Sequence, residues 1–203
     1  MLGPHGAGKT TLGRLLAERL GCVFAPELGA QLRRDALARD PGQHAMAPQE
    51  AFDDEVFRAE LDRDVNWAPG VVRVVETWHP GNAAYARERS PAVLARWRLR
   101  LAAELRRRRP WVLVQPLRVR HDTALARLTE PGPDPGALVA FFRRVGDEAE
   151  ALARAWRLRV LPALDTDDLA PDALVERVLR ASRSWAPPTG SLGAEALVRK
   201  APR

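Results

Sequence analysis

The sequence predicts an α/β fold in which a mostly parallel β-sheet carries helices on both faces, giving three layers. Short, apolar and β-branched segments alternate along the chain with longer segments whose apolar residues recur at helical spacing. Strands that alternate with helices are joined by right-handed crossovers, which cover both faces of a parallel sheet. The length of 203 residues suits one domain with a sizeable core, which we expect at residues 1–182.

The first third of the chain contains three predicted helices and one predicted strand. Leucines at helical spacing predict a helix over residues 10–20, which the following glycine ends. The apolar segment CVFAPE, residues 22–27, predicts a short buried strand. Helices are expected at residues 29–40, before a Pro-Gly pair, and at residues 48–67.

The middle of the chain contains two predicted strands on either side of an arginine-rich helix. The segment VVRVV, residues 71–75, is short and β-branched, which favours a strand. Residues 77–91 are expected to form a loop with at most one helical turn. An amphipathic helix is expected at residues 92–108, and PWVLVQP, residues 110–116, predicts the next strand.

The last third contains three predicted helices and a final strand. The helices are expected at residues 122–130, 137–157 and 170–182, the last with a proline near its first turn. The segment RVLPAL, residues 159–164, predicts the strand. Residues 183–203 are rich in Pro, Gly and Ser, and we expect them to form a disordered tail.

Composition narrows the classes of function. The formal net charge is +6, but basic residues are interspersed with Asp and Glu along helical segments, so solvated helix faces explain the charge better than a nucleic-acid partner does. The single cysteine, Cys22, precludes an intramolecular disulfide and favours a reducing, cytoplasmic location. No segment has the roughly 20 continuous apolar residues of a membrane span, so we expect no membrane association.

The segment GPHGAGKTT, residues 3–11, carries the most specific signal in the chain. It matches G-x-x-x-x-G-K-[ST] in full and adds a glycine within the loop. In this pattern the glycines let the backbone turn so that consecutive N–H groups face phosphate oxygens, and the following helix adds its positive N-terminal dipole. We therefore expect this loop to bind ATP. The expected contacts come from Gly3, Gly6, Ala7, Gly8, Lys9, Thr10 and Thr11.

Two side chains of this loop have expected chemical roles. Lys9 is expected to reach the β- and γ-phosphates, and the hydroxyl of Thr10 to ligate Mg²⁺. The only other lysine is Lys200, so an arginine-biased composition retains one lysine in the body of the chain. That lysine stands where a compact ammonium suits the chemistry.

Only Met1 and Leu2 precede the loop, although a strand of about five apolar residues is expected there, at the centre of the sheet. The first strand is therefore expected to be truncated. A start upstream of Met1 is the favoured explanation, because an empty central position leaves backbone groups and apolar helix faces unpaired. The alternatives are a sheet that lacks its central strand and a nonfunctional fragment.

With these motifs the chain resembles the nucleoside and nucleotide kinases of the phosphate-loop (P-loop) group, including thymidylate-kinase-like and deoxynucleoside-kinase-like proteins, and the small AAA-type ATP-binding domains related to them. The resemblance extends over residues 3–180, and the loop is its specific part. It implies the P-loop fold, Mg-ATP as cofactor, and transfer of the γ-phosphate to a nucleoside, a nucleotide or another small acceptor.

The resemblance also assigns two carboxylates. In the family an acidic residue after the second strand approaches the substrate hydroxyl, and the segment APE places Glu27 there. Another acidic residue, often followed by Arg, ends the third strand, and VVRVVE places Glu76 there with Thr77 instead of the Arg. Glu27 is thus expected to accept the acceptor's proton and Glu76 to hold a metal-bound water. The alternatives are helix-capping or salt-bridged surface carboxylates.

Family members close an arginine-bearing lid over the phosphates after the fourth strand. The segment VQPLRVRHDTALARLTEPG occupies that place, and Arg127 is the preferred candidate. Arg118, Arg120, Arg143 and Arg144 are the further candidates.

The segment ETWHPGN follows a strand end, where ligands bind in open α/β sheets. Trp78 is a candidate to stack on a substrate base, and Asn82 to hydrogen-bond the edge of the base or a sugar; Tyr85 belongs to the same cluster. The alternative is that Trp78 and Tyr85 pack this segment onto the sheet.

These observations predict a Mg-ATP-dependent kinase. A regulatory ATPase or nucleotide-binding module without a small-molecule acceptor is the alternative, and the missing Arg after Glu76 favours it. An arginine-rich nucleic-acid-binding protein that uses ATP is a weaker alternative. Turnover that depends on an added acceptor separates the first two.

Overall fold

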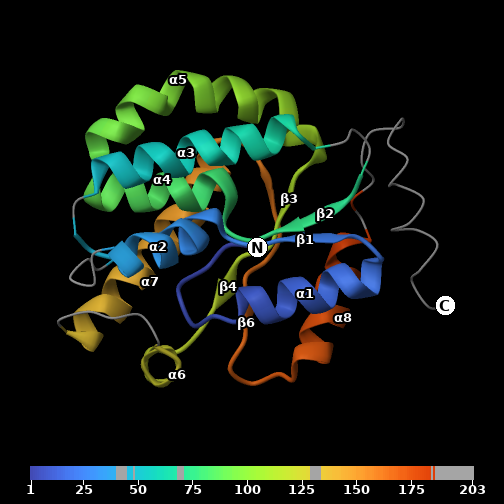
Figure 1. Ribbon diagram of the computed structural model, residues 1–203. Helices are drawn as coiled ribbons and strands as arrows, with labels where there is room; N and C mark the ends of the chain where they lie inside the picture. The colour runs from blue at the N-terminus through green and yellow to red at the C-terminus, as the bar shows by residue number, and fades with distance from the viewer. Residues whose placement is uncertain (40–44, 48, 68–70, 129–133, 184, 186–203) are drawn as a thin grey trace.

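The computed structural model describes residues 1–39, 45–47, 49–67, 71–128, 134–183 and 185. Its alternating helices and parallel strands confirm the predicted α/β class (Figure 1). In chain order the elements are α1 (Lys9–Leu20), β1 (Val23–Ala25), α2 (Leu28–Arg39), α3 (Glu50–Val65), β2 (Arg73–Val75), α4 (Trp78–Arg89), α5 (Pro91–Arg108), the 3-10 helix η1 (Arg109–Trp111), β3 (Leu113–Val114), β4 (Leu117–Arg118), α6 (His121–Ala126), α7 (Pro135–Ala155), β5 (Arg159–Val160), β6 (Leu164–Asp165) and α8 (Pro171–Ser182).

Three pairs of short parallel strands make up the sheet: β1 with β2, β3 with β5, and β4 with β6. Backbone hydrogen bonds from Leu161 to Val114 (2.9 Å) and from Leu164 to Pro116 (3.0 Å) continue the pairing between the last four strands. Pro116 separates β3 from β4 and Pro162 separates β5 from β6, because a proline has no N–H to donate to the ladder. The strand predicted at residues 159–164 is therefore interrupted. Of the strand predicted at residues 110–116 only Leu113 and Val114 form one, while residues 109–111 form the 3-10 helix η1 and β4 lies beyond the predicted range.

Met1 and Leu2 lie between the two halves of the sheet, in the position where a central strand was expected. On one side the N–H of Leu2 donates to the Gln115 carbonyl (3.0 Å) and the N–H of Leu117 donates to the Leu2 carbonyl (2.8 Å). On the other side the N–H of Thr77 donates to the Met1 carbonyl (3.0 Å). These two residues thus connect both halves at the edge of the sheet from which the phosphate loop departs, as the position of the N-terminus in Figure 1 shows.

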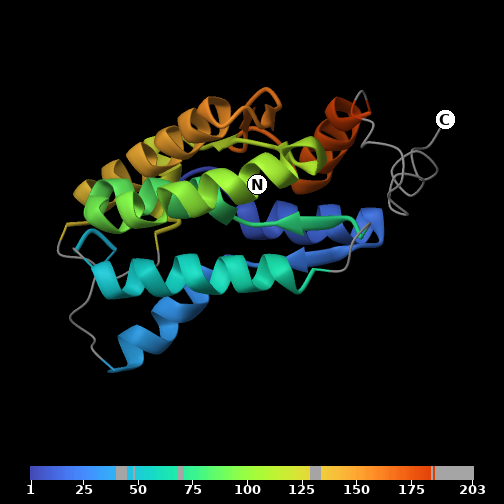
Figure 2. The same cartoon turned by 90° about the horizontal axis from the view of Figure 1, so that it is seen from above.

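Helices cover both faces of this sheet (Figures 1 and 2). Helices α1 and α8 pack together and form one apolar cluster with Val74 of β2 and Leu117 of β4. Helices α3, α4, α5 and α7 form the other cluster, which includes Leu2 and Val114. Side chains of neighbouring sheet positions thus enter different cores, which is the arrangement expected for a sheet buried on both faces.

Residues 78–89 form helix α4, so the prediction of a loop with at most one helical turn at residues 77–91 was wrong. Pro80 is the third residue of the helix, where its missing N–H forfeits no intrahelical hydrogen bond. The buried alanines 83, 84 and 86 let α4 pack closely against α7. The Pro-Gly pair therefore lies in the first turn of a core helix and does not mark a break.

The other helices lie within a few residues of their predicted bounds, apart from the one predicted at residues 122–130. Helix α6 ends at Ala126, and residues 129 and 130 lie outside the described part. Of the expected tail, residues 183–203, only Arg183 and Trp185 are described. None of the helices in the described part combines the length and apolar composition that crossing a bilayer requires.

Candidate functional site

The phosphate loop connects Leu2 of the sheet to helix α1. Gly3, Gly6 and Gly8 all have positive φ angles, of 143°, 78° and 76°, and Gly8 is the N-cap of α1. Residues with a Cβ rarely adopt these angles, so the glycines set the course of the loop. A Cβ placed on Gly8 would meet no atom within 4 Å, so the space before the helix N-terminus is open. The loop thus has the glycine-dependent backbone shape that is typical of phosphate-binding loops before a helix N-terminus.

Lys9 and Thr10 begin helix α1 and point toward the loop and the end of β2. Lys9 is only 8% exposed, and its Nζ donates to the Pro4 carbonyl at 3.1 Å. The hydroxyl of Thr10 donates to both carboxylate oxygens of Glu76, at 2.9 and 3.0 Å. The structure therefore brings Thr10 and Glu76 into contact, although they lie 66 residues apart in the chain, and Lys9 precedes Thr10 directly.

Glu76 directly follows β2 and is almost fully buried, at 6% exposure. Burial raises the pKa of its carboxyl above the ordinary value of 4.5; the Lys9 ammonium opposes this shift and the Glu27 carboxylate adds to it. Burial disfavours the charged form of this carboxylate, and the hydrogen bond from the Thr10 hydroxyl offsets part of that cost.

The raised pKa predicts how Glu76 affects stability. Between pH 4.5 and its folded-state pKa, Glu76 binds more protons in the folded than in the unfolded protein, so its contribution to stability falls as pH rises. We expect Glu76→Gln to be more stable than the wild type at pH 7, with the difference shrinking as pH falls through this window. Urea denaturation of both proteins from pH 4 to pH 8 checks this. A wild-type advantage at pH 7 would contradict it.

Glu27 follows β1 and faces the residue after Glu76. Its Oε2 accepts a hydrogen bond of 2.7 Å from the hydroxyl of Thr77. Because β1 and β2 are parallel neighbours, both carboxylates lie at the carboxyl edge of the sheet beside the phosphate loop.

Arg127 directly follows α6 and contacts the phosphate loop, with its Nη1 donating to the Gly6 carbonyl at 3.0 Å. Three of the further candidates bind carboxylates instead. Arg118 donates to Glu150, Arg120 to Asp168 and Arg144 to Glu88.

The three residues predicted to bind substrate have different environments. Trp78 is 7% exposed and its indole N–H donates to the Asp64 carboxylate at 3.2 Å, so its ring belongs to the core, as in the packing alternative. The side-chain amide of Asn82 donates to Glu60 at 3.1 Å. Asn82 and Tyr85 both line a cavity, whereas Trp78 is not among its lining residues.

This cavity of about 340 Å³ lies between the phosphate loop and helices α2, α3, α4 and α7, and is within the size range of small-molecule sites. Three arginines and two carboxylates line it together with three phenyl or phenol rings. His5 of the loop also lines it, and burial lowers the pKa of this imidazole. The lining residues are His5, Glu27, Gly29, Ala30, Arg33, Arg34, Ala45, Phe52, Asp53, Val56, Asn82, Tyr85, Arg89 and Phe142.

Sequence reasoning missed the cationic side chains of this cavity. Arg33 and Arg34 lie on α2, and Arg89 at the end of α4. The position of LRRDALARD immediately after the strand that ends near Glu27 was the available signal, because a helix that starts at a strand's carboxyl end passes the ligand site of an α/β sheet. The many other arginines obscured it.

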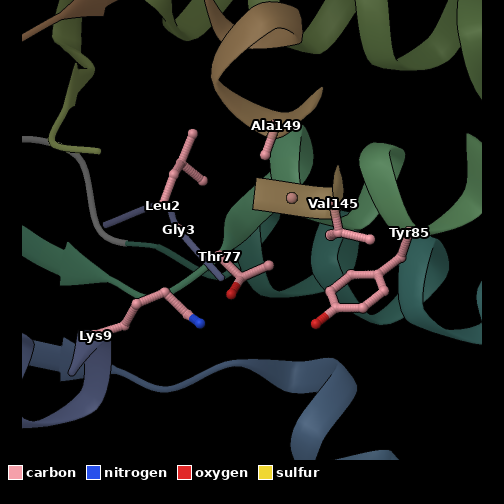
Figure 3. A pocket seen from close by; sticks show the side chains of 8 residues that line it. Leu2, Gly3, Lys9, Thr77, Tyr85, Val145 and Ala149 are labelled. Atoms are coloured by element: carbon pink, nitrogen blue, oxygen red, sulfur yellow. The ribbon is translucent and has the colours of Figure 1, made fainter. Parts of the chain in front are cut away.

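A second, smaller cavity of about 10 Å³ lies between Lys9, Thr77 and Tyr85, with a volume close to that of one water site. In Figure 3 the Lys9 ammonium and the Thr77 hydroxyl are directed toward the same space, and the Tyr85 hydroxyl points toward it from α4. Lys9 of the phosphate loop and Thr77, the hydrogen-bond donor to Glu27, thus line one small cavity.

The parallel sheet, the glycine-shaped phosphate loop at its centre, and the Thr10–Glu76 pair beside that loop define a P-loop protein. A family model described as "AAA domain" matches residues 1–155. The chain therefore belongs to the AAA domain family.

Two relatives are both kinases. A cytidylate kinase from Roseiflexus castenholzii is 34% identical over 122 residues, which cover 48% of this chain and 52% of the relative. A shikimate kinase from Saccharopolyspora erythraea is 31% identical over 191 residues, which cover 88% of this chain and 90% of the relative. The match thus spans about half the length of the first relative and most of the second, and the chain is a P-loop protein of the small-molecule kinase-like kind.

Proposed function

We propose that this protein is an ATP-dependent kinase that transfers the γ-phosphoryl group of Mg-ATP to a small hydroxylated acceptor carrying an anionic group. The observation that carries the proposal is the arginine-lined cavity of about 340 Å³, which reaches the phosphate loop at His5 and includes Glu27. An acceptor in this cavity would lie next to the phosphate loop, because His5 of the loop lines the cavity. That adjacency is what in-line phosphoryl transfer requires.

The residues of the loop fit Mg-ATP. The positive φ angles of Gly3, Gly6 and Gly8 give the loop a course that suits a phosphate, and Lys9 adds a nearly buried ammonium bound to the loop carbonyl of Pro4. The Thr10 hydroxyl and the Glu76 carboxylate, 2.9 to 3.0 Å apart, are the hard oxygen donors that Mg²⁺ prefers. When bound, Mg²⁺ neutralises charge on the β- and γ-phosphates. Lys9 and the loop N–H groups hold the same phosphates in place.

Glu27 is the proposed proton acceptor for the hydroxyl of the acceptor molecule. It lines the cavity, and one of its oxygens is held by Thr77. A general base has to lie within hydrogen-bond distance of the proton it removes, and the place of this carboxylate in the cavity wall supports that role.

Arg127 is the proposed lid residue. Its contact with the Gly6 carbonyl places a guanidinium at the loop before any nucleotide is present. In this role it would exchange that carbonyl for a phosphate oxygen, which is a stronger partner for a guanidinium.

The cavity supports an anionic acceptor of moderate size. Arg89 is neutralised by Asp53 within the cavity wall, whereas Arg34 is exposed at its rim. Guanidinium groups bind phosphate and carboxylate in a bidentate way. The names of the two relatives, cytidylate kinase and shikimate kinase, both denote kinases of acceptors with such a group, one a phosphate and the other a carboxylate.

The test is ADP release in the presence and absence of acceptors, with nucleoside monophosphates and hydroxylated carboxylic acids as two panels. We expect turnover to require one of these acceptors, and Glu27→Gln to reduce it about 100-fold by removing the proton acceptor. Glu176→Gln is the matched control, since this carboxylate pairs with Arg19 on the other face of the sheet. ATP hydrolysis that proceeds equally without any acceptor would support a regulatory ATPase instead.

A further inference from the structure

Thr77, the residue after Glu76, lies in a strained turn. Its φ and ψ angles are 69° and −71°, a region that β-branched residues rarely adopt. The N–H of Trp78 donates to the Glu76 carbonyl at 3.0 Å and closes a γ-turn around Thr77. Such strain persists only where the surroundings impose it, and it is concentrated at functional sites.

Contacts on both sides impose this turn. The N–H of Thr77 donates to the Met1 carbonyl at 3.0 Å, which ties the turn to the centre of the sheet. The indole of Trp78, the next residue, donates to the buried Asp64 carboxylate at 3.2 Å. The backbone of Thr77 is therefore held between the sheet and helix α3.

The side chain of Thr77 is held as tightly as its backbone. Its hydroxyl donates to Oε2 of Glu27 at 2.7 Å, and the residue is 5% exposed. A Cβ added to Gly81 would lie 2.3 Å from the Thr77 methyl carbon, so the methyl occupies the space that a side chain at Gly81 would need. With the methyl placed against Gly81, the hydroxyl is directed at Glu27.

We infer that Thr77 is a positioning residue that fixes the carboxylate of Glu27, and that Gly81 sets the side-chain orientation of Thr77. A free glutamate side chain samples many rotamers, whereas a hydrogen bond of 2.7 Å to one oxygen holds the carboxylate and leaves the other oxygen for the proton of the acceptor. The catalytic consequence rests on the proposed kinase function, but the pairing itself does not.

A double-mutant cycle on stability tests the pairing without any activity assay. Thr77→Val removes the hydroxyl, and Glu27→Ala removes the carboxylate. We expect the two changes to be coupled by about threefold to tenfold in the unfolding equilibrium constant, measured by urea denaturation. Thr166→Val is the matched control, because this buried threonine donates to the Arg118 carbonyl instead and should be additive with Glu27→Ala. Additive effects of Thr77→Val and Glu27→Ala would overturn the inference.

A compensating pair tests the role of Gly81. In an open helix, Gly→Ala stabilises, so a loss of stability in Gly81→Ala would come from the collision with the Thr77 methyl. Thr77→Ser keeps the hydroxyl and removes that methyl. We expect Gly81→Ala alone to lower the melting temperature and Thr77→Ser in the same protein to restore most of it. A stable Gly81→Ala protein would overturn this part of the inference.

Turnover separates positioning from mere packing. We expect Thr77→Val to lower kcat about tenfold with an unchanged KM for ATP, Thr77→Ser to retain most of the activity, and Thr77→Val to have no further effect in Glu27→Gln. If Thr77→Val and Glu27→Gln lowered kcat independently, so that their effects multiplied in the double variant, the positioning role would be overturned. The cycle could show coupling in stability while the wild-type protein phosphorylates no acceptor. That result would support the pairing of Thr77 with Glu27 and contradict the kinase function.

Discussion

Replacing Lys9 by alanine is expected to reduce turnover about 100- to 1,000-fold, the cost of removing one charged donor from a preorganised site. Lys9 is 8% exposed, its ammonium donates to the Pro4 carbonyl of the phosphate loop at 3.1 Å, and it lines a small cavity together with Thr77 (Figure 3). An ammonium in such a place stabilises charge that develops on a transferred phosphoryl group more strongly than it would in water. Steady-state kinetics and calorimetric titration with Mg-ATP measure the effect.

Two variants sharpen this result. Lys9→Arg keeps the charge, but the planar guanidinium is larger and presents its donors differently, so we expect it to remain impaired. Lys200→Ala removes the other lysine and should match the wild type. Unchanged ATP affinity and turnover in Lys9→Ala would contradict ATP binding at this loop.

The largest expected loss of stability follows from breaking the buried ion pair between Arg89 and Asp53. Both side chains are 3% exposed, and the guanidinium donates to the carboxylate through Nε (3.0 and 3.2 Å) and Nη2 (2.5 Å). Its Nη1 also donates to the Ala45 carbonyl at 2.8 Å. Removing one partner leaves the other charge buried and unpaired, so Arg89→Met is expected to lower the free energy of unfolding by about 3 to 5 kcal/mol.

Urea denaturation measures this loss, and the chain offers two comparisons. Arg58→Met breaks an exposed pair with Asp54 one helical turn away and should cost less than about 1 kcal/mol. The double variant Asp53→Leu, Arg89→Met removes both charges and should recover much of the stability lost by Arg89→Met alone. Equal losses of the free energy of unfolding in Arg89→Met and Arg58→Met would contradict the larger contribution expected from the buried Arg89–Asp53 pair.

This ion pair also shapes the proposed acceptor site. Arg89 lines the cavity while it is held by Asp53, so it forms a rigid wall. The aromatic ring of Phe52 lies against it, with the guanidinium carbon 5.3 Å from the ring centre. Loss of the pair is therefore expected to disturb the cavity as well as the fold.

The amino-acid sequence alone determined the phosphate loop and the class of fold. The loop contacts come from consecutive residues, Gly3 to Thr11, and glycines at fixed spacing before a helix leave few alternative shapes. The order of the strands and helices was likewise predicted, apart from α4 and the division of the last strands into β3 to β6, because each element's periodicity is local and parallel pairing follows from alternation. The expected places of Glu27 and Glu76 came from the family resemblance, and the structure puts both at the carboxyl edge of the sheet.

Only the tertiary structure decided what lies around that loop. Helix α4 was misread because Pro80 and Gly81 indicate a break locally, whereas packing against α7 stabilises a helix there. The sequence left open whether Trp78 stacks on a substrate or packs the segment, and the structure shows that its ring is 7% exposed within a core cluster. The cavity draws Arg34, Arg89 and Phe142 from three helices far apart in sequence, and no local pattern reports which side chains will converge. Helices and strands can be predicted from the local spacing of apolar residues. A site made from several helices depends on packing between residues far apart in sequence, and that packing is defined only in the complete fold.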